Sequence, residues 1–343
     1  MSGIRLSICI ATYKRAEYIG ATIASIVPQL RPGVELIVVD GASPDDTPRA
    51  IGPWLSHSGF RYYREPVNSG IDADYDKAVS YAAGEYCWLM TDDDLFLDGA
   101  VDEVLSHLGQ HDLVVVNAEV RDKGLARKLR DSMLRSAADR TFHEGEAEWA
   151  FIDCADYLSF IGGVVVRRAF WLARERTPYY GTLFIHVGVL FQKPAVSRVA
   201  VIGRPLLVIR FGNAMWSARS FEIWMFKWPA LIWSFEHFSL AARGAVTARH
   251  PFHSVKRLLW FRAIGGYSMD EYRQFLHVPA GVLRRVLARF IARVPGPLAN
   301  FLCAAYYAFR ARLGASGMEL YDLERSPHST ELARRVAARR AQR

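Results

Sequence analysis

The sequence predicts an α/β protein whose first half is a doubly wound, mostly parallel β-sheet. Three observations support this prediction. Short apolar runs recur along the chain, segments with helical spacing separate them, and polar residues directly follow three of the runs. Strands that alternate with helices favour parallel pairing, because each crossover returns the chain to the same end of the sheet. The predicted strands are 6–11, 34–39, 60–64 and 86–90, and the predicted helices include 17–30 and 74–83.

Composition and charge divide the chain into two regions. Of its 343 residues, 51% are hydrophobic and 23% are charged, which is typical of a folded protein and excludes wholesale disorder. Residues 204–343 carry 22 Lys and Arg against 8 Asp and Glu, whereas residues 1–203 carry 21 against 27. We therefore predict an α/β domain over 1–210, followed by a helical, basic and aromatic region over 211–343 that meets an anionic surface.

The cysteines and the apolar runs indicate the cellular compartment in which the protein resides. Four scattered cysteines lack the spacing of a zinc site or a disulfide framework, so a reducing cytosol fits best. The first apolar run reads as a strand rather than as the core of a signal peptide. No uncharged apolar run reaches the roughly 18–20 residues that a spanning helix needs. We therefore expect a cytoplasmic protein.

Three consecutive aspartates, Asp92, Asp93 and Asp94, follow the strand at 86–90. Adjacent carboxylates repel one another in a partly buried site. A hard divalent cation such as Mg²⁺ or Mn²⁺ relieves this repulsion while it bridges phosphate oxygens. The alternative is a helix N-terminus, where acidic side chains complement the helix dipole.

Two further strand ends carry polar residues. Thr12 and Tyr13 follow the first strand, and Asp40 ends the second. Ligands bind beyond the carboxyl ends of such strands, so these residues and the aspartates should share one edge. Asp40 would accept hydrogen bonds from a ribose or a base, although Asp-Gly is also common turn chemistry.

A polar loop, Asn68–Gly70, precedes the predicted helix at 74–83. Gly70 permits close approach of the backbone to a ligand. Asp72 or Asp74, just beyond it, could cap the helix or face that ligand, and capping is expected for at least one of them.

These segments together resemble the family 2 glycosyltransferases. The segments that carry the resemblance are Ser7–Arg15, Val38–Ser43, Asp46–Thr47, Asn68–Gly70 and Tyr86–Asp94. The last of them is most similar to the abequosyltransferase-like branch, which builds bacterial surface polysaccharide. The resemblance covers about residues 4–105 and continues more loosely to about 210. It implies the GT-A fold, a nucleoside-diphosphate-sugar donor, Mg²⁺ or Mn²⁺, and an inverting transfer.

The resemblance also implies roles for matching residues on the donor side. A base pocket, a ribose contact and a loop around the nucleotide would be formed by Thr12, Tyr13, Arg15, Asp40, Asn68, Gly70, Asp72 and Asp92. Asp93 would bind the metal, with Asp92 as a further ligand. Asp94 would face the donor sugar or the acceptor and is also a candidate metal ligand. Thr91 stands at the first acidic place of the family's usual Asp-x-Asp-Asp, which leaves open which two aspartates act.

The general base does not follow from the family pattern. Members usually carry Glu-Asp about twenty residues after a glycine-rich stretch, here Gly162–Arg168, whereas this chain has Tyr180–Val187 without an acid. His186 is therefore the candidate base or additional metal ligand, and a hydrogen-bonded structural histidine is the alternative. Asp153 and Asp156 are the other candidate bases.

The rear region predicts contact with a membrane. Residues 221–240 are dense in aromatic side chains, and 282–294 form a basic amphipathic helix. Residues 298–309 follow as a second interfacial or oligomer-forming helix. Such a region suits a peripheral enzyme on the cytoplasmic membrane face with a saccharide acceptor linked to polyprenyl diphosphate. The alternative is an ordinary surface helix packed on the core.

Two other function classes also account for part of the sequence. A metal-dependent nucleotidyltransferase would also place acids at a strand end, but it would normally carry a glycine-rich phosphate loop, which this sequence lacks. A basic, non-enzymatic nucleic-acid-binding module would account for the charge. The dense tryptophans favour a membrane instead, so we expect no nucleic-acid partner.

Overall fold

The computed structural model describes residues 3–213, 215, 217–276, 281–311 and 317–341. The chain divides into two compact units. Unit 1 comprises Met1–Glu119, Asp131–Ile209 and Phe235–Val246, and unit 2 comprises Val120–Arg130, Arg210–Ser234 and Thr247–Arg343. The predicted boundary after residue 210 differs from this division at two segments. Residues 120–130 lie before that boundary but belong to unit 2, and residues 235–246 lie after it but belong to unit 1.

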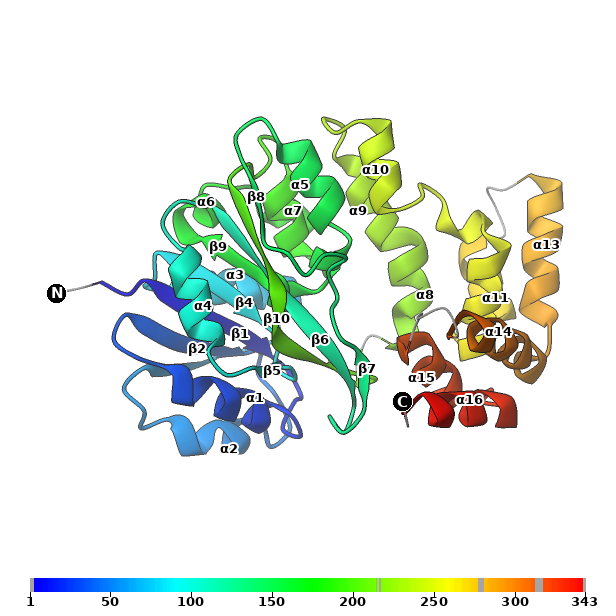
Figure 1. Ribbon diagram of the computed structural model, residues 1–343, viewed down its shortest axis with the longest axis horizontal. Coiled ribbons are helices and arrows are strands. Elements are labelled where there is room, and N and C mark those ends of the chain that lie inside the picture. The colour runs from blue at the N-terminus through cyan, green and yellow to red at the C-terminus, as the bar shows by residue number, and fades with distance from the viewer. Residues whose placement is uncertain (1–2, 214, 216, 277–280, 312–316, 342–343) are drawn as a thin grey trace. The chain divides into compact units, whose positions relative to one another are not determined.

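Unit 1 is built on one mixed sheet with strand order β3-β2-β1-β4-β9-β6-β10-β5 (Figure 1). The first four strands pair in parallel, as predicted. They are β1 (Leu6–Thr12), β2 (Val34–Asp40), β3 (Phe60–Arg64) and β4 (Tyr86–Met90). The later strands join with antiparallel pairs at β4–β9, β6–β9, β10–β5 and β10–β8. They are β5 (Leu95–Phe96), β6 (Leu113–Asp122), β8 (Arg140–Phe142), β9 (Val164–Arg167) and β10 (Val199–Phe211).

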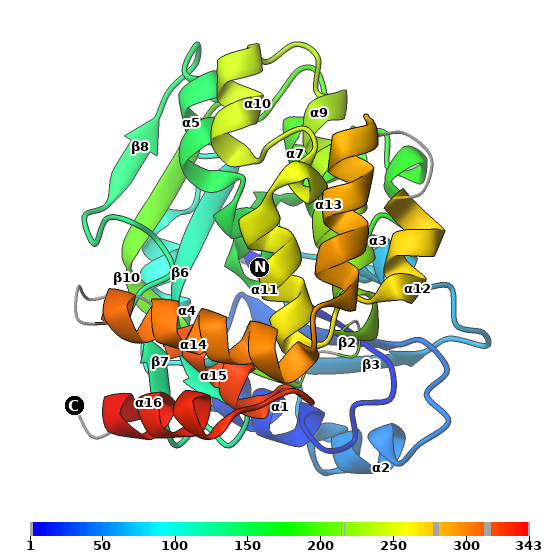
Figure 2. The same cartoon turned by 90° about the vertical axis from the view of Figure 1, so that its right-hand side faces the viewer.

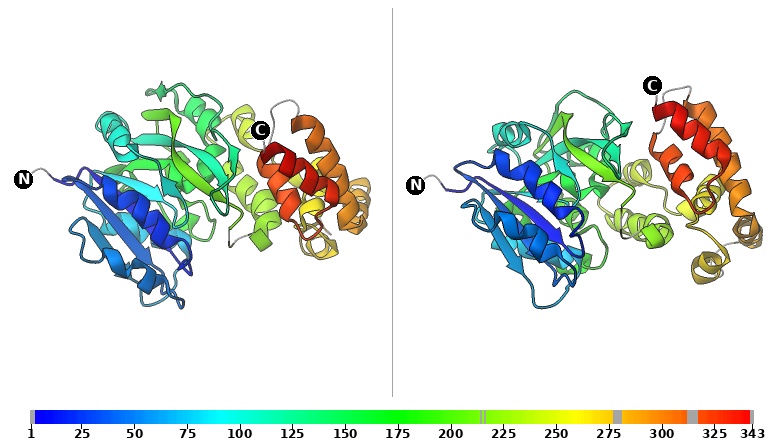
Figure 3. Two further views of the ribbon diagram at one scale, coloured as in Figure 1. Left: turned by 60° about the horizontal axis from the view of Figure 1, so that its bottom comes forward. Right: turned by 90° about the horizontal axis from the view of Figure 1, so that it is seen from below.

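Helices cover both faces of the parallel strands, which explains their continuous apolar runs. Every residue of β1 and β2 is buried. Ile8 and Ile10 pack with Ile23 of α1 and Val104 of α4. On the other face the Cys9 thiol contacts the Ala78 carbonyl of α3. The helices of unit 1 are α1 (Ile19–Ile26), α2 (Thr47–Ile51), α3 (Ile71–Tyr81), α4 (Ala100–His107), α5 (Ala147–Cys154), α6 (Arg168–Leu172), α7 (Ile185–Phe191) and α10 (Leu240–Val246). The blue helices lie against the first strands in Figure 3.

Unit 2 is mostly helical (Figure 2). One core joins Phe221, Phe261 and Tyr267 to Ile291, and a second joins Ala263 to Ala304. Its elements are β7 (Lys128–Arg130), α8 (Ser220–Glu222), α9 (Trp228–Ser234), α11 (Val255–Ile264), α12 (Met269–Glu271), α13 (Val282–Arg293), α14 (Gly296–Ala311), α15 (Gly317–Arg325) and α16 (Glu331–Ala341), with π-helical turns at Ile223–Lys227 and Tyr272–Leu276.

The aromatic segment 221–240 does not form the predicted membrane face. Phe221 is buried, and its ring stacks on Tyr267 with 4.9 Å between centroids. Trp228 is buried as well. Phe238 belongs to unit 1, where its ring stacks on Phe151 at 4.2 Å. These rings are core residues, because the helices that carry them pack against other aromatic rings of their own unit.

None of the described helices alone is long and apolar enough to cross a bilayer. Together, α13 and α14 satisfy the length and composition requirements, but the two helices are bent by 99° at their junction.

Candidate functional site

The carboxyl ends of the first strands bring the predicted polar residues to one edge of the sheet. Thr12 of β1 is in register with Asp40 of β2, and Asp40 is in register with Arg64 of β3. On the other side of β1, Met90 of β4 pairs with Ile10. The aspartates that follow Met90 therefore emerge beside the end of β1.

Arg15 joins the loop after β1 to the acidic cluster. Its Nε donates to Asp92 Oδ1 at 3.0 Å, and its Nη2 donates to Asp93 Oδ2 at 2.5 Å. The Arg15 and both aspartate side chains are about nine-tenths buried. The guanidinium also lies 5.2 Å from the ring centroid of Tyr18. One cation thus holds two adjacent carboxylates in place.

The pKa of Asp92 shows that this cation does not fully offset the local electrostatics. Burial and the negative charge of Asp93 together raise the pKa of the Asp92 carboxyl to about 7. Arg15 and the Thr12 hydroxyl lower it. The charged form of Asp92 is therefore costly here, and any additional cation at this edge would favour it.

Asp94 is held from its own side of the cluster. The Thr91 hydroxyl donates to Asp94 Oδ2 at 2.5 Å. The negative charges of this cluster also act on two buried tyrosines. Burial and the charge of Asp94 raise the pKa of Tyr157, and burial and the three aspartates raise that of Tyr75. The Tyr75 hydroxyl donates to the Met90 carbonyl at 2.9 Å and so fixes the end of β4.

The loops after β1 and β2 are bonded to each other. The Lys14 amide donates to Ser43 Oγ, and the Arg15 amide donates to Thr47 Oγ1, both at 3.0 Å. Gly41 lies so close to α3 that a Cβ there would be 2.5 Å from Asp74 Oδ2. A side chain at position 41 would clash, so this glycine allows the loop and the first turn of α3 to meet.

Asp40 is fully buried and its two oxygens have partners. The Ser43 amide donates to Oδ1 and the Tyr62 hydroxyl donates to Oδ2, both at 2.7 Å. Tyr13, which begins the loop after β1, is half-buried at the same edge. A carboxylate held by a backbone amide is rigid, so Asp40 fixes the loop after β2 beside the end of β1, and its contact with a donor remains a prediction.

Asn68 and Gly70 form an exposed turn at the start of α3. Asn68 Oδ1 accepts from the Gly70 amide at 2.8 Å, and Gly70 has a φ of 89° that favours glycine. Asp72 has a different task from the donor contact that the resemblance implies. Its carboxylate accepts from the Leu183 amide at 2.9 Å and from the Ile185 amide at 3.1 Å. It therefore caps α7, which lies more than a hundred residues further along the chain.

His186 is a structural histidine, which corrects its predicted role as base or metal ligand. Its side chain in α7 is 1% exposed, and Nε2 bonds the Leu158 carbonyl at 2.7 Å. Burial lowers its pKa to about 4. An imidazole closed off from solvent and bonded to the backbone through Nε2 has no accessible nitrogen for an acceptor hydroxyl.

The other two predicted bases lie near α5. Asp153 pairs with Arg140, whose Nη2 is 2.7 Å from Oδ2, and about a third of the aspartate side chain is exposed. Asp156 is exposed just beyond the end of α5. The contacts of Asp153 run to β8 rather than to the aspartates after β4, so its role as a base remains a prediction, as does that of Asp156.

Whether a divalent cation fits this edge depends on the side chains that could act as its ligands. In the described part of the chain, no three His, Cys, Asp or Glu side chains are arranged as a complete metal site. The described residues therefore show no closed site made of Asp92, Asp93, Asp94 and His186. Hard cations in nucleotide sites commonly take one or two carboxylates and complete their shell with phosphate oxygens and water. The carboxylates of Asp92, Asp93 and Asp94 fit such an open site.

The comparisons with known proteins show what the front part of the chain is similar to. Residues 7–162 match the sequence model described as Glycosyl transferase family 2, and this range contains every strand end at the acidic edge. The chain therefore contains a region that is similar to the family 2 glycosyltransferases. It is similar to the abequosyltransferase RfbV of Salmonella typhimurium, with 26% identity over 228 residues, which are 61% of this chain and 67% of that protein. The uncharacterized protein Rv1520 of Mycobacterium tuberculosis is 34% identical over 96 residues, covering 27% of this chain and 28% of that protein.

Two solved structures show the same fold as this glycosyltransferase. TarS of S. aureus, in complex with UDP, aligns with a TM-score of 0.56 and 16% identity, covering 98% of this chain and 91% of that chain. The mannosyltransferase PcManGT of Pyrobaculum calidifontis, in complex with GDP-Man and Mn²⁺, aligns with a TM-score of 0.51 and 14% identity, covering 98% and 88%. These likenesses confirm the predicted GT-A architecture.

Two residues of the glycosyltransferase site were missed by the sequence reasoning. Tyr62 bonds Asp40, and Tyr75 supports the end of β4. The placement of Tyr75 on the sheet-facing side of the predicted helix was a usable signal, whereas the Tyr62 contact joins two separate strands, which no local pattern contains. Asp74, predicted with Asp72 as a helix cap or a donor contact, lies 2% exposed against Gly41.

Proposed function

We propose that this glycosyltransferase moves a sugar from a nucleoside diphosphate donor to a saccharide acceptor during synthesis of bacterial surface polysaccharide. The observation that carries the proposal is the buried cluster of Asp92, Asp93 and Arg15 beside Thr12 and Asp40 at the carboxyl edge of the sheet. The similarity to an abequosyltransferase supports the choice of product class.

The donor would bind along this edge. Thr12 and Tyr13 would line the base pocket, and Asp40, held by Ser43 and Tyr62, would accept a hydrogen bond from the base or ribose. The exposed Asn68–Gly70 turn would close over the nucleotide from the side of α3. Arg15 would keep Asp92 and Asp93 oriented and contribute positive charge toward the diphosphate.

Asp93, with Asp92 beside it, would hold Mg²⁺ or Mn²⁺ together with the donor phosphates. Such a cation, when bound, stabilises the negative charge of the departing diphosphate. The raised pKa of Asp92 supports this assignment, because a bound cation would favour the charged carboxylate. A solved relative of the same fold contains Mn²⁺ with GDP-Man.

In the transfer, an acceptor hydroxyl forms a bond to the anomeric carbon while the bond to the diphosphate oxygen breaks. The hydroxyl proton passes to a base, for which we propose Asp94 in an inverting reaction. Its carboxylate is fixed by Thr91 and lies next to the proposed metal ligand. A lipid-linked saccharide is the proposed acceptor.

Donor hydrolysis tests this function. The purified chain should release nucleoside diphosphate slowly from one member of a panel of UDP-, GDP-, dTDP- and CDP-sugars, and only with Mg²⁺ or Mn²⁺ present. D93N should lower this release by about 100-fold, because it removes a charged ligand next to the leaving group. Asp98 is exposed just before α4, so D98N is the matched control and should retain the wild-type rate.

Two results would overturn the proposal. The first is folded protein that hydrolyses no member of the panel with either metal. The second is D93N that matches D98N. Release of pyrophosphate from a nucleoside triphosphate and a sugar phosphate would instead favour a nucleotidyltransferase. The anomeric configuration of the transferred sugar, read by NMR, tests inversion.

A further inference from the structure

The helix α14 has its large apolar side chains on the outside. Its inner face buries small residues, chiefly Ala299, Cys303 and Ala304. Its outer face exposes Leu298, Phe301, Leu302, Tyr306 and Phe309, with Phe309 65% exposed. A surface helix normally turns its large apolar residues toward the core and its polar residues outward. This helix does the reverse.

Hydrogen bonds fix that orientation. Asn300 on the inner face donates from Nδ2 to the Ala263 and Leu323 carbonyls, and its Oδ1 accepts from the Thr330 hydroxyl at 2.8 Å. The Asn300 side chain is fully buried. Rotation of α14 to hide its leucines and phenylalanines would break this network, so the outer face stays apolar.

The preceding helix α13 has the same arrangement. It buries Ala288, Ile291 and Ala292, and the Tyr267 hydroxyl donates to the Ala288 carbonyl at 3.0 Å. Its outer face exposes Val282, Leu283, Val286, Leu287 and Phe290, with Leu283 81% exposed. Exposed apolar faces of this size mark surfaces that bind a partner or a membrane. Figure 2 looks onto both helices from the outside of unit 2.

Basic side chains surround this apolar surface. Arg289 and Arg293 are exposed on α13, and Lys256 and Arg310 both approach the Tyr306 hydroxyl on α14. The sequence has no acidic residue between Glu271 and Glu319. The helices thus expose apolar and positively charged side chains together, which matches the interior and the headgroups of an anionic bilayer.

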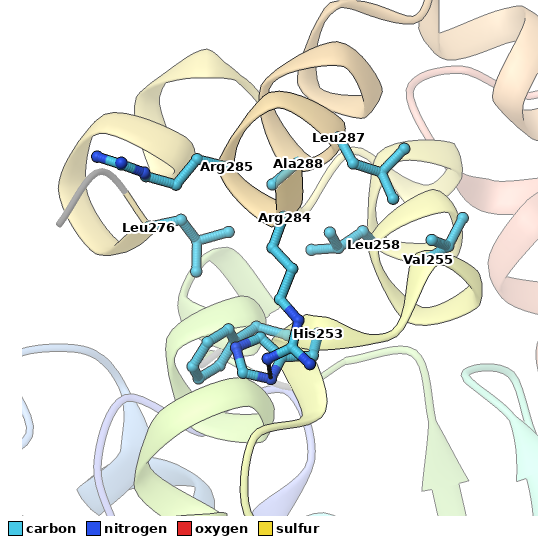
Figure 4. Close-up of a pocket in the computed structure, with 9 residues that line it drawn as sticks. His253, Val255, Leu258, Leu276, Arg284, Arg285, Leu287 and Ala288 are labelled. Carbon is cyan, nitrogen blue, oxygen red and sulfur yellow. Dashed lines mark hydrogen bonds between the residues drawn. The ribbon is translucent and has the colours of Figure 1, made fainter. Parts of the chain in front are cut away.

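A small hollow beside α13 is also lined by both apolar and basic side chains. Leu258, Leu276 and Leu287 line it, and Arg284 and Arg285 extend from α13 around it (Figure 4). The Arg284 Nη1 lies 3.1 Å from His253 Nδ1. Burial and the charge of Arg284 both lower the pKa of His253, so protonation of this imidazole beside the arginine is disfavoured.

We propose that the outer faces of α13 and α14 dock unit 2 onto the surface of a bilayer that contains anionic phospholipid. Both helices would lie in the headgroup plane, with Leu283, Phe290 and Phe309 inserted among the acyl chains. The arginines would contact lipid phosphates. Two helices joined at 99° can lie along one flat surface, whereas α13, with an arginine at every turn, is unsuited to cross it.

The alternative occupant is a second copy of this chain. In a two-fold dimer the same patch faces itself, so arginines of α13 would meet arginines across the interface. The stretch between Glu271 and Glu319 offers no carboxylate to neutralise them. Anionic lipid supplies the missing negative charge, and it therefore fits this surface better than a second copy does.

Vesicle flotation tests the docking. The full-length protein should float with vesicles of phosphatidylcholine and phosphatidylglycerol, more weakly at raised salt and on pure phosphatidylcholine. The double variant Leu283→Glu with Phe290→Glu should weaken binding by about 100-fold or more, because two inserted apolar side chains become charged. Arg289→Gln with Arg293→Gln should weaken binding to anionic vesicles by about fivefold for each arginine, with little effect on neutral vesicles.

A matched control distinguishes loss of docking from loss of folding. Leu55 and Trp149 are exposed apolar residues of unit 1, at 55% and 66%, so Leu55→Glu with Trp149→Glu adds the same charge elsewhere. This control should float like the wild type. All variants should retain the wild-type melting temperature and far-ultraviolet circular dichroism, since the substituted side chains are exposed.

Three outcomes would overturn the docking. The wild type could remain in the buffer with anionic vesicles, the Leu283/Phe290 variant could float unchanged, or that variant could dissociate an oligomer in vesicle-free solution. The last result would assign the face to contact between copies. The purpose of docking rests on the proposed lipid-linked acceptor, but its test does not. Donor hydrolysis without vesicles should be equal in the wild type and these variants, so failure of the reaction and failure of docking are separately visible.

Discussion

Arg15 determines the electrostatics of the acidic cluster. It contacts Asp92 and Asp93 at the same time, and all three side chains are about nine-tenths buried. Removing one partner of a buried ion pair leaves charge without compensation, whereas removing the whole pair is often mild. The stability of this edge of the sheet therefore depends on the positive charge of Arg15. An added cation can replace that charge, so its binding should appear as a change in stability.

We expect Arg15→Ala to lower the free energy of unfolding by about 3–5 kcal/mol without divalent metal. Mn²⁺ should restore part of this loss, because it replaces the missing positive charge, and its stabilising effect should exceed that on the wild type. Thermal melts with and without Mn²⁺ measure both quantities. The control is Arg49→Ala, since Arg49 is 85% exposed and pairs on the surface with Asp46. Equal melting temperatures for the two variants would contradict the expectation.

His186 makes the stability depend on pH. In the folded protein burial lowers its pKa from the ordinary 6.5 to about 4. Above pH 6.5 the histidine is neutral in both states and adds no pH dependence. As pH falls from 6.5 toward 4, the unfolded chain binds the proton first, so stability is lost by at most about 3 kcal/mol.

The variant His186→Gln should lose less stability than the wild type between pH 7 and pH 4. Chemical denaturation at a series of pH values measures this difference. His143 is exposed, so His143→Gln should keep the wild-type profile. Because we exclude His186 as base, His186→Gln should also retain donor turnover with an acceptor. A loss of turnover in the folded variant, at unchanged donor hydrolysis, would restore the catalytic assignment.

At the scale of elements, α7 depends on a side chain from a distant helix. This helix has seven residues and begins at Ile185, where the Asp72 carboxylate of α3 accepts two backbone hydrogen bonds. Short helices gain little stability from their own hydrogen bonds, so their ends matter. Asp72 thereby joins the donor side of unit 1 to the segment in which the family usually carries its base.

We expect Asp72→Ala to destabilise the protein by about 1–3 kcal/mol, because two buried amide groups lose their acceptor. Hydrogen exchange should accelerate at the start of α7 more than in α1. Asp72→Asn, which keeps an oxygen acceptor without the charge, should have a smaller effect. Exposed Asp98→Ala serves as the reference. Unchanged exchange in α7 for Asp72→Ala would contradict the capping role.

At the scale of the whole molecule, the two units carry different surfaces. Unit 1 contains the acidic donor edge, and unit 2 contains the apolar and basic outer faces of α13 and α14. A donor that binds only the folded state should stabilise the unit that holds its site. The division of the chain therefore predicts that ligand protection is confined to one unit.

A nucleotide sugar with Mn²⁺ should slow hydrogen exchange around the ends of β1, β2 and β4 and leave α13 to α16 unchanged. At a donor concentration about 100 times its Kd, the added stability should approach about 2.7 kcal/mol. The same donor with a chelator in place of Mn²⁺ is the control and should protect less. Equal protection of α14 would show that the donor site is not limited to unit 1.

The sequence by itself determined the parallel front of the sheet, the resemblance to the family 2 glycosyltransferases and the acidic edge that we propose binds the donor. These features are local: each strand is a continuous apolar run, and each polar group follows a strand directly, so period and order along the chain were sufficient. The tertiary structure decided the features that depend on contacts between distant segments. Arg15 meets the aspartates across 77 residues, Asp72 caps α7, and the His186 side chain is closed off by the Leu158 carbonyl. The rear region shows the same distinction most clearly, because helical periodicity marks an apolar face but does not say whether the protein covers it. Of the aromatic rings at 221–240, Phe221, Trp228, Phe235 and Phe238 are buried in their own units, whereas the outer faces of α13 and α14 are left exposed.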